Sequence, residues 1–105
     1  VENWCGEYTL QELVAVIRNA RLMISTDSGP MHIALATKTK TIGLFGCTDP
    51  DILVKGSKYI EVISSYETCP KKYQFNHNNE PPDWKQECMR KISVEEVFEN
   101  VKRII

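Results

Sequence analysis

Two polar turns, each placed directly after an apolar run, hold the groups of this chain that are best suited to chemistry. The first turn reads Thr-Asp-Ser-Gly-Pro from Thr26, after an apolar stretch that ends at Ser25. A helix of small residues follows, and a strand, tight turn and helix in this order aim free backbone N–H groups and a positive dipole end at one point. That point suits a diphosphate, so we expect the chain to hold part of a nucleotide-bearing ligand.

The first turn offers main-chain donors and a carboxylate. Ser28 and Gly29 have small side chains, which let an anion approach the backbone closely. Pro30 suits a first helical turn because its missing N–H would be unpaired there in any case. Asp27 can accept hydrogen bonds from the N–H groups that follow it, as an N-cap residue does. Capping by Asp27 with no bound ligand is therefore an equal alternative.

A histidine and a second turn extend the candidate site. His32 falls in the first helical turn, where a neutral ring can donate a hydrogen bond to a phosphate and a protonated ring adds charge. Packing of His32 against a neighbouring loop is the alternative.

The second turn reads Gly-Cys-Thr-Asp-Pro from Gly46. Its Thr48 can offer a hydroxyl and a backbone N–H to the same ligand. A purely structural turn, in which Thr48 contacts no ligand, is an equal alternative. Asp49 before Pro50 is typical of a turn initiator.

The elements that position these turns alternate between strand and helix, which predicts a parallel sheet with helices on its faces. Strands are expected at residues 1–5, 22–25, 41–45 and 59–63. Helices are expected after a capping box at Thr9, at residues 30–37, and at 93–105 after a second capping box at Ser93. Ligands of such sheets lie beyond the carboxyl ends of the strands, where both polar turns fall.

The cysteines favour a reduced, metal-free protein. Cys5, Cys47, Cys69 and Cys88 are widely spaced and form no C-x-x-C pair, which favours reduced thiols in a cytoplasmic setting. A bridge between Cys69 and Cys88 stays open. A metal site of these two with His77 lacks a fourth ligand, so we expect no metal and no cofactor.

Composition limits the chain to one small domain or part of one. It has 105 residues, of which 42% are hydrophobic, and a net charge of −1. This balance gives no electrostatic reason to expect nucleic acid as a partner. Residues 64–91 are polar and contain prolines, which predicts a long irregular loop. Because position 1 is Val, we expect a fragment of a longer product.

The two turns together resemble the C-terminal half of glycosyltransferase family 9, the family of bacterial ADP-heptose:lipopolysaccharide heptosyltransferases. The resemblance rests on Asp-Ser-Gly-Pro-Met-His-Ile-Ala from Asp27 and on Leu-Phe-Gly-Cys-Thr-Asp-Pro from Leu44, with further similarity from Gly6 and from Cys88. It implies a GT-B architecture, in which two Rossmann-like domains face each other across a cleft. Residues 1–105 would be one three-layer α/β Rossmann-like domain that binds the nucleotide-sugar donor.

The resemblance also implies an activity. The parent enzyme would transfer a sugar, with heptose from ADP-heptose expected, to a lipopolysaccharide-core or other saccharide acceptor with inversion. Asp27, Ser28 and Gly29 would contact the donor diphosphate, with His32 nearby and Thr48 on the adjoining turn. The catalytic base belongs to the missing N-terminal half, so the chain alone is expected to be inactive. The expected location is the cytoplasm or the inner face of the bacterial inner membrane.

Two other functions remain open. Non-hydrolysing UDP-sugar 2-epimerases share the Thr-Asp-Ser-Gly turn but usually continue with Gly and a Gln-Glu pair, where this chain has Pro30, Met31 and His32. A non-catalytic module that docks a partner through the long loop is the second alternative. Because a domain without its neighbour exposes apolar surface, self-association of the chain is also expected.

Overall fold

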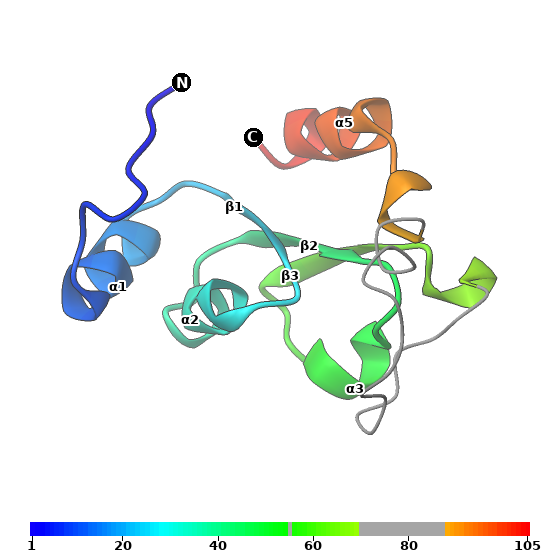
Figure 1. The fold of residues 1–105 in the computed structure, drawn as a ribbon, viewed down its shortest axis with the longest axis horizontal. Coiled ribbons are helices and arrows are strands. Elements are labelled where there is room, and N and C mark those ends of the chain that lie inside the picture. The colour runs from blue at the N-terminus through cyan, green and yellow to red at the C-terminus, as the bar shows by residue number, and fades with distance from the viewer. Residues whose placement is uncertain (55, 70–87) are drawn as a thin grey trace.

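The structure is a computed structural model that describes residues 1–54, 56–69 and 88–105. In these ranges three strands form one parallel sheet in the order β1-β2-β3 (Figure 1). The strands are β1 (Met23–Thr26), β2 (Thr41–Phe45) and β3 (Ile60–Ser64). The predicted parallel sheet is confirmed, with β1 and β3 each starting one residue later than expected.

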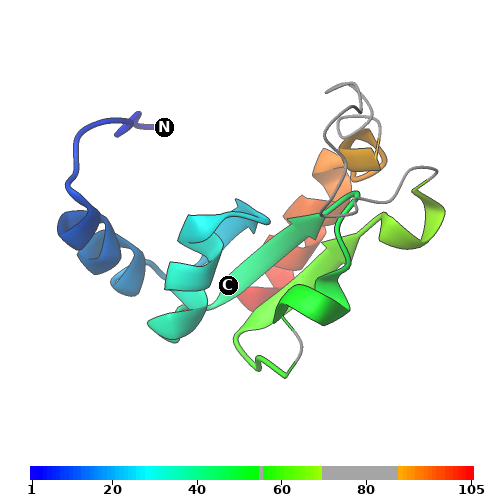
Figure 2. The ribbon, with the colours of Figure 1, turned by 60° about the horizontal axis from the view of Figure 1, so that its bottom comes forward.

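Helices cover both faces of the sheet, which confirms the predicted three-layer α/β fold (Figures 1 and 2). They are α1 (Leu10–Arg18), α2 (Gly29–Ala36), α3 (Pro50–Val54) and α5 (Val94–Ile104). Helices α2 and α3 lie on one face, α5 lies on the other, and α1 packs beside α2. The short helix α3 is not predicted from the sequence, because five residues are too few to show a helical period.

The main core lies between the sheet and the helices α2 and α3. Phe45 of β2 and Met31 of α2 are both fully buried, and Val54 of α3 packs with them. Gly43 of β2 leaves room for this packing. A Cβ there would lie 2.7 Å from Cδ1 of Ile60 and 2.8 Å from Cε2 of Phe45. Burial of these apolar groups is the main force that holds α2, and with it the first polar turn, on the sheet.

Local hydrogen bonds define where two helices begin. The Thr9 hydroxyl accepts from the Glu12 N–H at 3.2 Å, and the Glu12 carboxylate accepts from the Thr9 N–H at 3.1 Å. The predicted capping box is thus confirmed, and the bond from the Thr9 N–H lowers the pKa of Glu12. At α5, Ser93 accepts from the Glu96 N–H at 3.1 Å. Only this half of the second predicted box is formed among the described residues.

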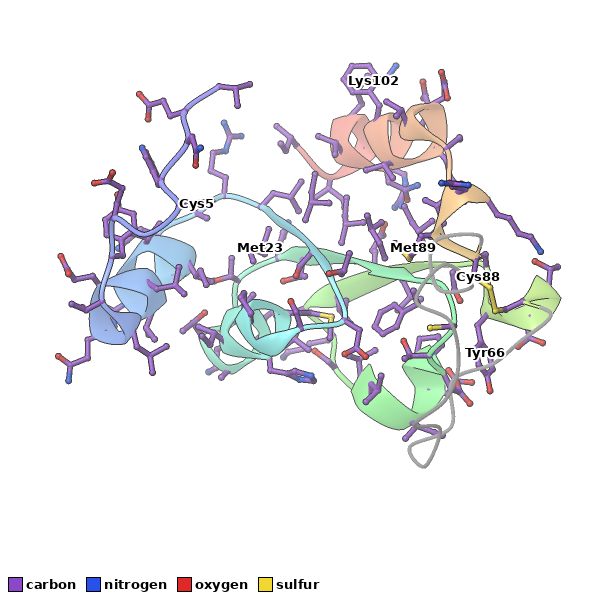
Figure 3. The ribbon with its side chains drawn as sticks, in the orientation of Figure 1. Cys5, Met23, Tyr66, Cys88, Met89 and Lys102 are labelled. Carbon is purple, nitrogen blue, oxygen red and sulfur yellow. A yellow bond between two sulfur atoms is a disulfide. The ribbon has the colours of Figure 1, made fainter. Side chains whose placement is uncertain are left out.

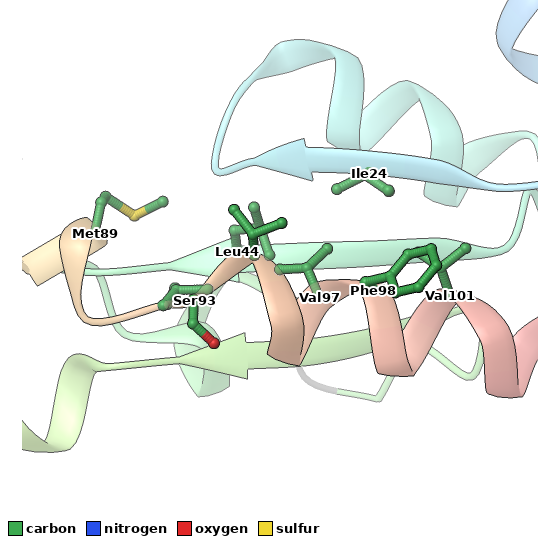
Figure 4. Close-up of a pocket in the computed structure, with 9 residues that line it drawn as sticks. Ile24, Leu44, Met89, Ser93, Val97, Phe98 and Val101 are labelled. Atoms are coloured by element: carbon green, nitrogen blue, oxygen red, sulfur yellow. The ribbon is translucent and has the colours of Figure 1, made fainter.

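The opposite face of the sheet is only partly covered. The apolar run at residues 22–25 suggests a buried strand, but β1 is not fully buried, because Ile24 is 46% exposed. Helix α5 lies over β2 and β3, where Arg103 forms an ion pair with Glu61. A groove of about 370 Å³ remains beside β1, with Leu44 and Phe98 in its lining (Figure 4). The expected self-association stays a prediction.

The predicted long loop is structured at both ends. A 3-10 turn, η1 (Tyr66–Thr68), follows β3, and residues 88–90 form a helical turn before α5. Residues 70–87, including His77, lie outside the described residues. At the other end of the chain, the expected strand at residues 1–5 is wrong, because these residues are exposed and pair with no strand of the described sheet.

The expectation of four reduced thiols is wrong for two of them, because Cys69 and Cys88 form a disulfide. Nineteen positions separate them in sequence, so their spacing alone does not reveal that the fold brings them together. Cys88 is held at the end of β3, where the Ser65 hydroxyl donates to its carbonyl oxygen. None of the helices in the described ranges is long and apolar enough to cross a bilayer.

The packing around Gly43 can be tested by substitution. We expect Gly43→Val to destabilise the fold by about 1–3 kcal/mol, because the new side chain would collide with Ile60 and Phe45. Urea unfolding followed by circular dichroism measures this change. Ile52→Ala is the control, since Ile52 is 72% exposed on α3 and its loss should cost less than about 0.5 kcal/mol. An unchanged midpoint for Gly43→Val would contradict the described core.

Candidate functional site

The two polar turns leave the same edge of the sheet, as predicted. Strands β1 and β2 are parallel neighbours, and Thr26 pairs with Leu44 near their carboxyl ends. Neighbouring strands lie about 4.8 Å apart. Residues 27–29 and 46–48 therefore start side by side, each leading from a strand into a helix (Figure 1). This register is what brings the candidate groups of the two turns together.

The N-terminus of α2 is not capped by the side chain of its N-cap residue. Ser28 is the N-cap residue, with extended backbone angles (φ −159°, ψ 170°), and its side chain makes no capping hydrogen bond. The first bonded amide is that of Met31, which donates to the Ser28 carbonyl at 3.2 Å. The backbone N–H groups of Asp27, Ser28 and Gly29 donate to no atom of the described residues. The positive end of the helix dipole is thus left with donors to offer.

The serine hydroxyls fold back onto the end of β1 instead of capping the helix. Ser25 Oγ and Ser28 Oγ lie 3.2 Å apart, and they donate to the Thr26 carbonyl at 2.8 and 3.2 Å. Asp27 accepts no backbone N–H of the described residues, so capping as its role is wrong. Sequence reasoning missed Ser25, whose only signal is a hydroxyl placed three positions before Ser28.

The side of the turn at Gly29 is not covered by the described residues. Gly29 is exposed, and a Cβ built on it would meet no atom of another described segment within 4 Å. Asp27 and Ser28 are half-buried. None of the described residues therefore crowds Gly29, which agrees with the small side chains noted in the sequence.

His32 faces the turn from the first turn of α2. Its Nε2 lies 3.8 Å from Oδ1 of Asp27, and the two side chains are 50% and 26% exposed. This distance is too long for a hydrogen bond, so the pair attracts only when the ring is protonated. The exposure of the ring argues against packing on a loop as the role of His32. A protonated His32 would offset the negative charge of Asp27 beside a bound anion.

The second turn divides its polar residues between two roles. The Asp49 carboxylate accepts from the Asp51 N–H at 2.9 Å, which confirms Asp49 as the turn initiator that starts α3. Thr48 is half-buried on the turn, next to the first turn by the strand register. Its contact with a ligand stays a prediction.

Within the described ranges, no three side chains of His, Cys, Asp or Glu gather where they could hold a metal ion. His77 lies outside these ranges. The expectation that the site works without metal or cofactor stays a prediction.

Comparison with known proteins assigns the chain to a family. The sequence model of glycosyltransferase family 9 (heptosyltransferase) matches residues 1–82. The lipopolysaccharide core heptosyltransferase OpsX of Haemophilus influenzae is 32% identical over 97% of this chain and 30% of its own length. A lipooligosaccharide heptosyltransferase 2 of Campylobacter jejuni is 28% identical over 99% of this chain and 32% of its own length. No solved structure gives a significant match.

A shorter match is closer in identity. Lipopolysaccharide heptosyltransferase 3 of Escherichia coli is 52% identical over 44 residues, or 42% of this chain and 13% of its own length. The chain spans about a third of the two longer-matching relatives. Since the family model covers most of its residues, the chain belongs to glycosyltransferase family 9 (heptosyltransferase).

Proposed function

We propose that residues 1–105 are the donor-binding domain of an inverting glycosyltransferase with GT-B architecture, and that the turn after β1 holds the diphosphate of a nucleotide sugar. One observation carries this proposal. The N–H groups of Asp27, Ser28 and Gly29 lack partners among the described residues, at the N-terminus of a helix whose first residue, Gly29, is exposed.

The physical basis is the attraction between phosphate oxygens and the exposed helix end. Hydrogen bonds to charged groups contribute about 1.5–3 kcal/mol each, and a helix dipole adds about 0.3–1 kcal/mol. The negative charge of the Asp27 carboxylate repels an anion, and a protonated His32 would offset this charge. Thr48 would donate from the adjoining turn. The balance predicts weak binding of a nucleoside diphosphate by the chain alone, with a dissociation constant of about 1 mM, or −4 kcal/mol.

The same donors would favour the transfer step. In an inverting reaction an acceptor hydroxyl attacks the anomeric carbon from the face opposite the departing group, and the bond to the nucleoside diphosphate breaks. Negative charge then grows on the phosphate oxygen beside residues 27–29, where fixed N–H groups stabilise it. The general base that removes the acceptor proton would come from the other domain of the parent protein, so the chain alone should be inactive.

The names of the relatives suggest the substrates. The proteins reported above are heptosyltransferases of lipopolysaccharide or lipooligosaccharide. We extend this to the parent of the present chain, with ADP-heptose as donor and a lipopolysaccharide-core saccharide as acceptor. Work on such an acceptor would place the parent in the cytoplasm or at the inner face of the bacterial inner membrane.

The two alternatives differ in what supports them. The epimerase alternative loses support from the Pro30-Met31-His32 sequence and from the family match. The docking-module alternative relied on the long loop, of which residues 70–87 lie outside the described residues. It is separated from the donor domain by nucleotide binding.

Titration calorimetry with ADP, UDP and GDP tests diphosphate binding by the 105-residue chain. We expect weak binding that Ser28→Glu reduces at least about tenfold, equal to about 1.4 kcal/mol, because a carboxylate would occupy and repel the anion site. Ser28→Ala removes the same hydroxyl without adding charge and should bind more tightly than Ser28→Glu. Gln11→Glu adds the same charge on α1, and it should bind each nucleotide as tightly as the unsubstituted 105-residue chain does. Equal affinity of all four proteins for each nucleotide would favour the docking module.

The activity is tested on the longer protein that contains this chain. We expect it to transfer heptose from ADP-heptose to a lipopolysaccharide-core acceptor with inversion at the anomeric carbon. Mass spectrometry and the anomeric proton coupling of the product measure both points. Recovery of an epimerised nucleotide sugar with no transfer product would contradict the proposal.

A further inference from the structure

Three buried cysteines meet at the edge of the sheet that carries the candidate site. Cys47, Cys69 and Cys88 form one apolar cluster and are 9%, 6% and 0% exposed. Each comes from a different segment: the turn after β2, the end of η1 and the helical turn before α5. Cys69 and Cys88 are the disulfide pair, beside Met89 in Figure 3. The disulfide therefore packs against the same turn that carries Thr48.

A second contact joins these segments at the neighbouring residue. A Cβ on Gly46 would lie 2.9 Å from Sδ and 3.1 Å from the backbone nitrogen of Met89. The turn at residues 88–90 therefore lies directly against the main chain of Gly46, and a side chain at position 46 would force Met89 to move. Figure 3 places Met89 next to Cys88 at this end of the sheet.

Further bonds tie the helical turn to the end of β3. The Ser65 hydroxyl donates to the Cys88 carbonyl, and the Lys91 ammonium donates to the Thr68 carbonyl at 2.6 Å. The bond at Ser65 is buried, whereas the bond at Lys91 is exposed. The disulfide is the covalent link in this set, and it keeps Cys88 and Met89 against residues 46 and 47.

We propose that the Cys69–Cys88 disulfide, acting through Cys47 and Met89, positions the turn at residues 46–48 so that Thr48 meets the donor diphosphate. This inference rests on the proposed function of the site. The disulfide, Cys47 and Met89 are positioning groups that do not touch the donor. Reduction of the disulfide removes the covalent link, and the turn then samples positions in which Thr48 does not reach the ligand.

The reduction itself is an ordinary thiol–disulfide exchange with an added dithiol such as dithiothreitol. One thiolate of the reductant attacks one sulfur of the disulfide, the S–S bond breaks, and the other cysteine leaves as a thiolate. The second thiol of the reductant then displaces the first cysteine. Two electrons and two protons pass to Cys69 and Cys88, and the reductant leaves as a cyclic disulfide.

Amide hydrogen exchange followed by NMR tests the positioning without reference to any ligand. The 105-residue chain is compared with and without dithiothreitol, with a chelator present so that reduced thiols capture no zinc. We expect the amides of residues 46–48 to exchange at least about threefold faster after reduction, while those of α1 are unchanged. Cys69→Ser combined with Cys88→Ser should match the reduced protein. Cys5→Ser is the control, because Cys5 is exposed on the side of α1, away from the disulfide (Figure 3).

A second pair of variants keeps the test decisive if reduction loosens the whole fold. Met89→Ala removes the contact with Gly46 while the disulfide stays intact, and it should speed exchange at residues 46–48. Met89→Leu keeps a side chain of similar size and should restore slow exchange. Unchanged exchange at these residues in both the reduced protein and Met89→Ala would overturn the inference.

The role toward the donor is tested by combining reduction with Thr48→Val. In the oxidised chain, Thr48→Val should weaken ADP binding at least about threefold, whereas in the reduced chain it should add little, since coupled changes are not additive. Equal ADP affinity of the oxidised and reduced proteins would overturn the positioning role but leave the proposed function intact. Absence of ADP binding to the oxidised chain would reject the proposed function, while the exchange result would still stand.

Discussion

Parallel pairing between β1 and β2 is the constraint on which the candidate site depends. Because Thr26 pairs with Leu44, two polar turns that are about 20 residues apart in sequence leave the sheet at one edge. A register shift by one residue would turn every side chain of β1 to the other face and detach α2 from its core. Burial of Met31 against Phe45 of β2 holds α2 on the sheet that has this register.

Packing of α2 on the core determines where its N-terminus lies. The backbone N–H groups at that end then determine what the turn can bind. The hydroxyls of Ser25 and Ser28 are directed to the Thr26 carbonyl, so they stabilise the strand end and leave the helix end uncapped. Uncapped N–H groups are costly when buried, but Gly29 is exposed, and among the described residues no other segment lies within 4 Å of a Cβ built on it. The absence of a cap is therefore compatible with stability, and it is the feature that a diphosphate would use.

Features encoded within a few residues could be predicted from the sequence, and features that depend on distant contacts could not. The capping box at Thr9 needs only four consecutive residues, and the apolar run at residues 41–45 marks β2 directly. The disulfide joins segments 19 positions apart, and the 46% exposure of Ile24 depends on where α5 lies. The contact of Met89 with Gly46 has no local signal, since a glycine after a strand is equally typical of a plain turn.

Titration of the ¹⁵N-labelled chain with ADP, with each amide followed by NMR, shows whether the first turn receives a diphosphate through its main chain. We expect the amides of Asp27, Ser28 and Gly29 to shift most and to saturate together, with smaller shifts at His32 and Thr48. Saturable shifts elsewhere that leave residues 27–29 unchanged would contradict this mode of binding.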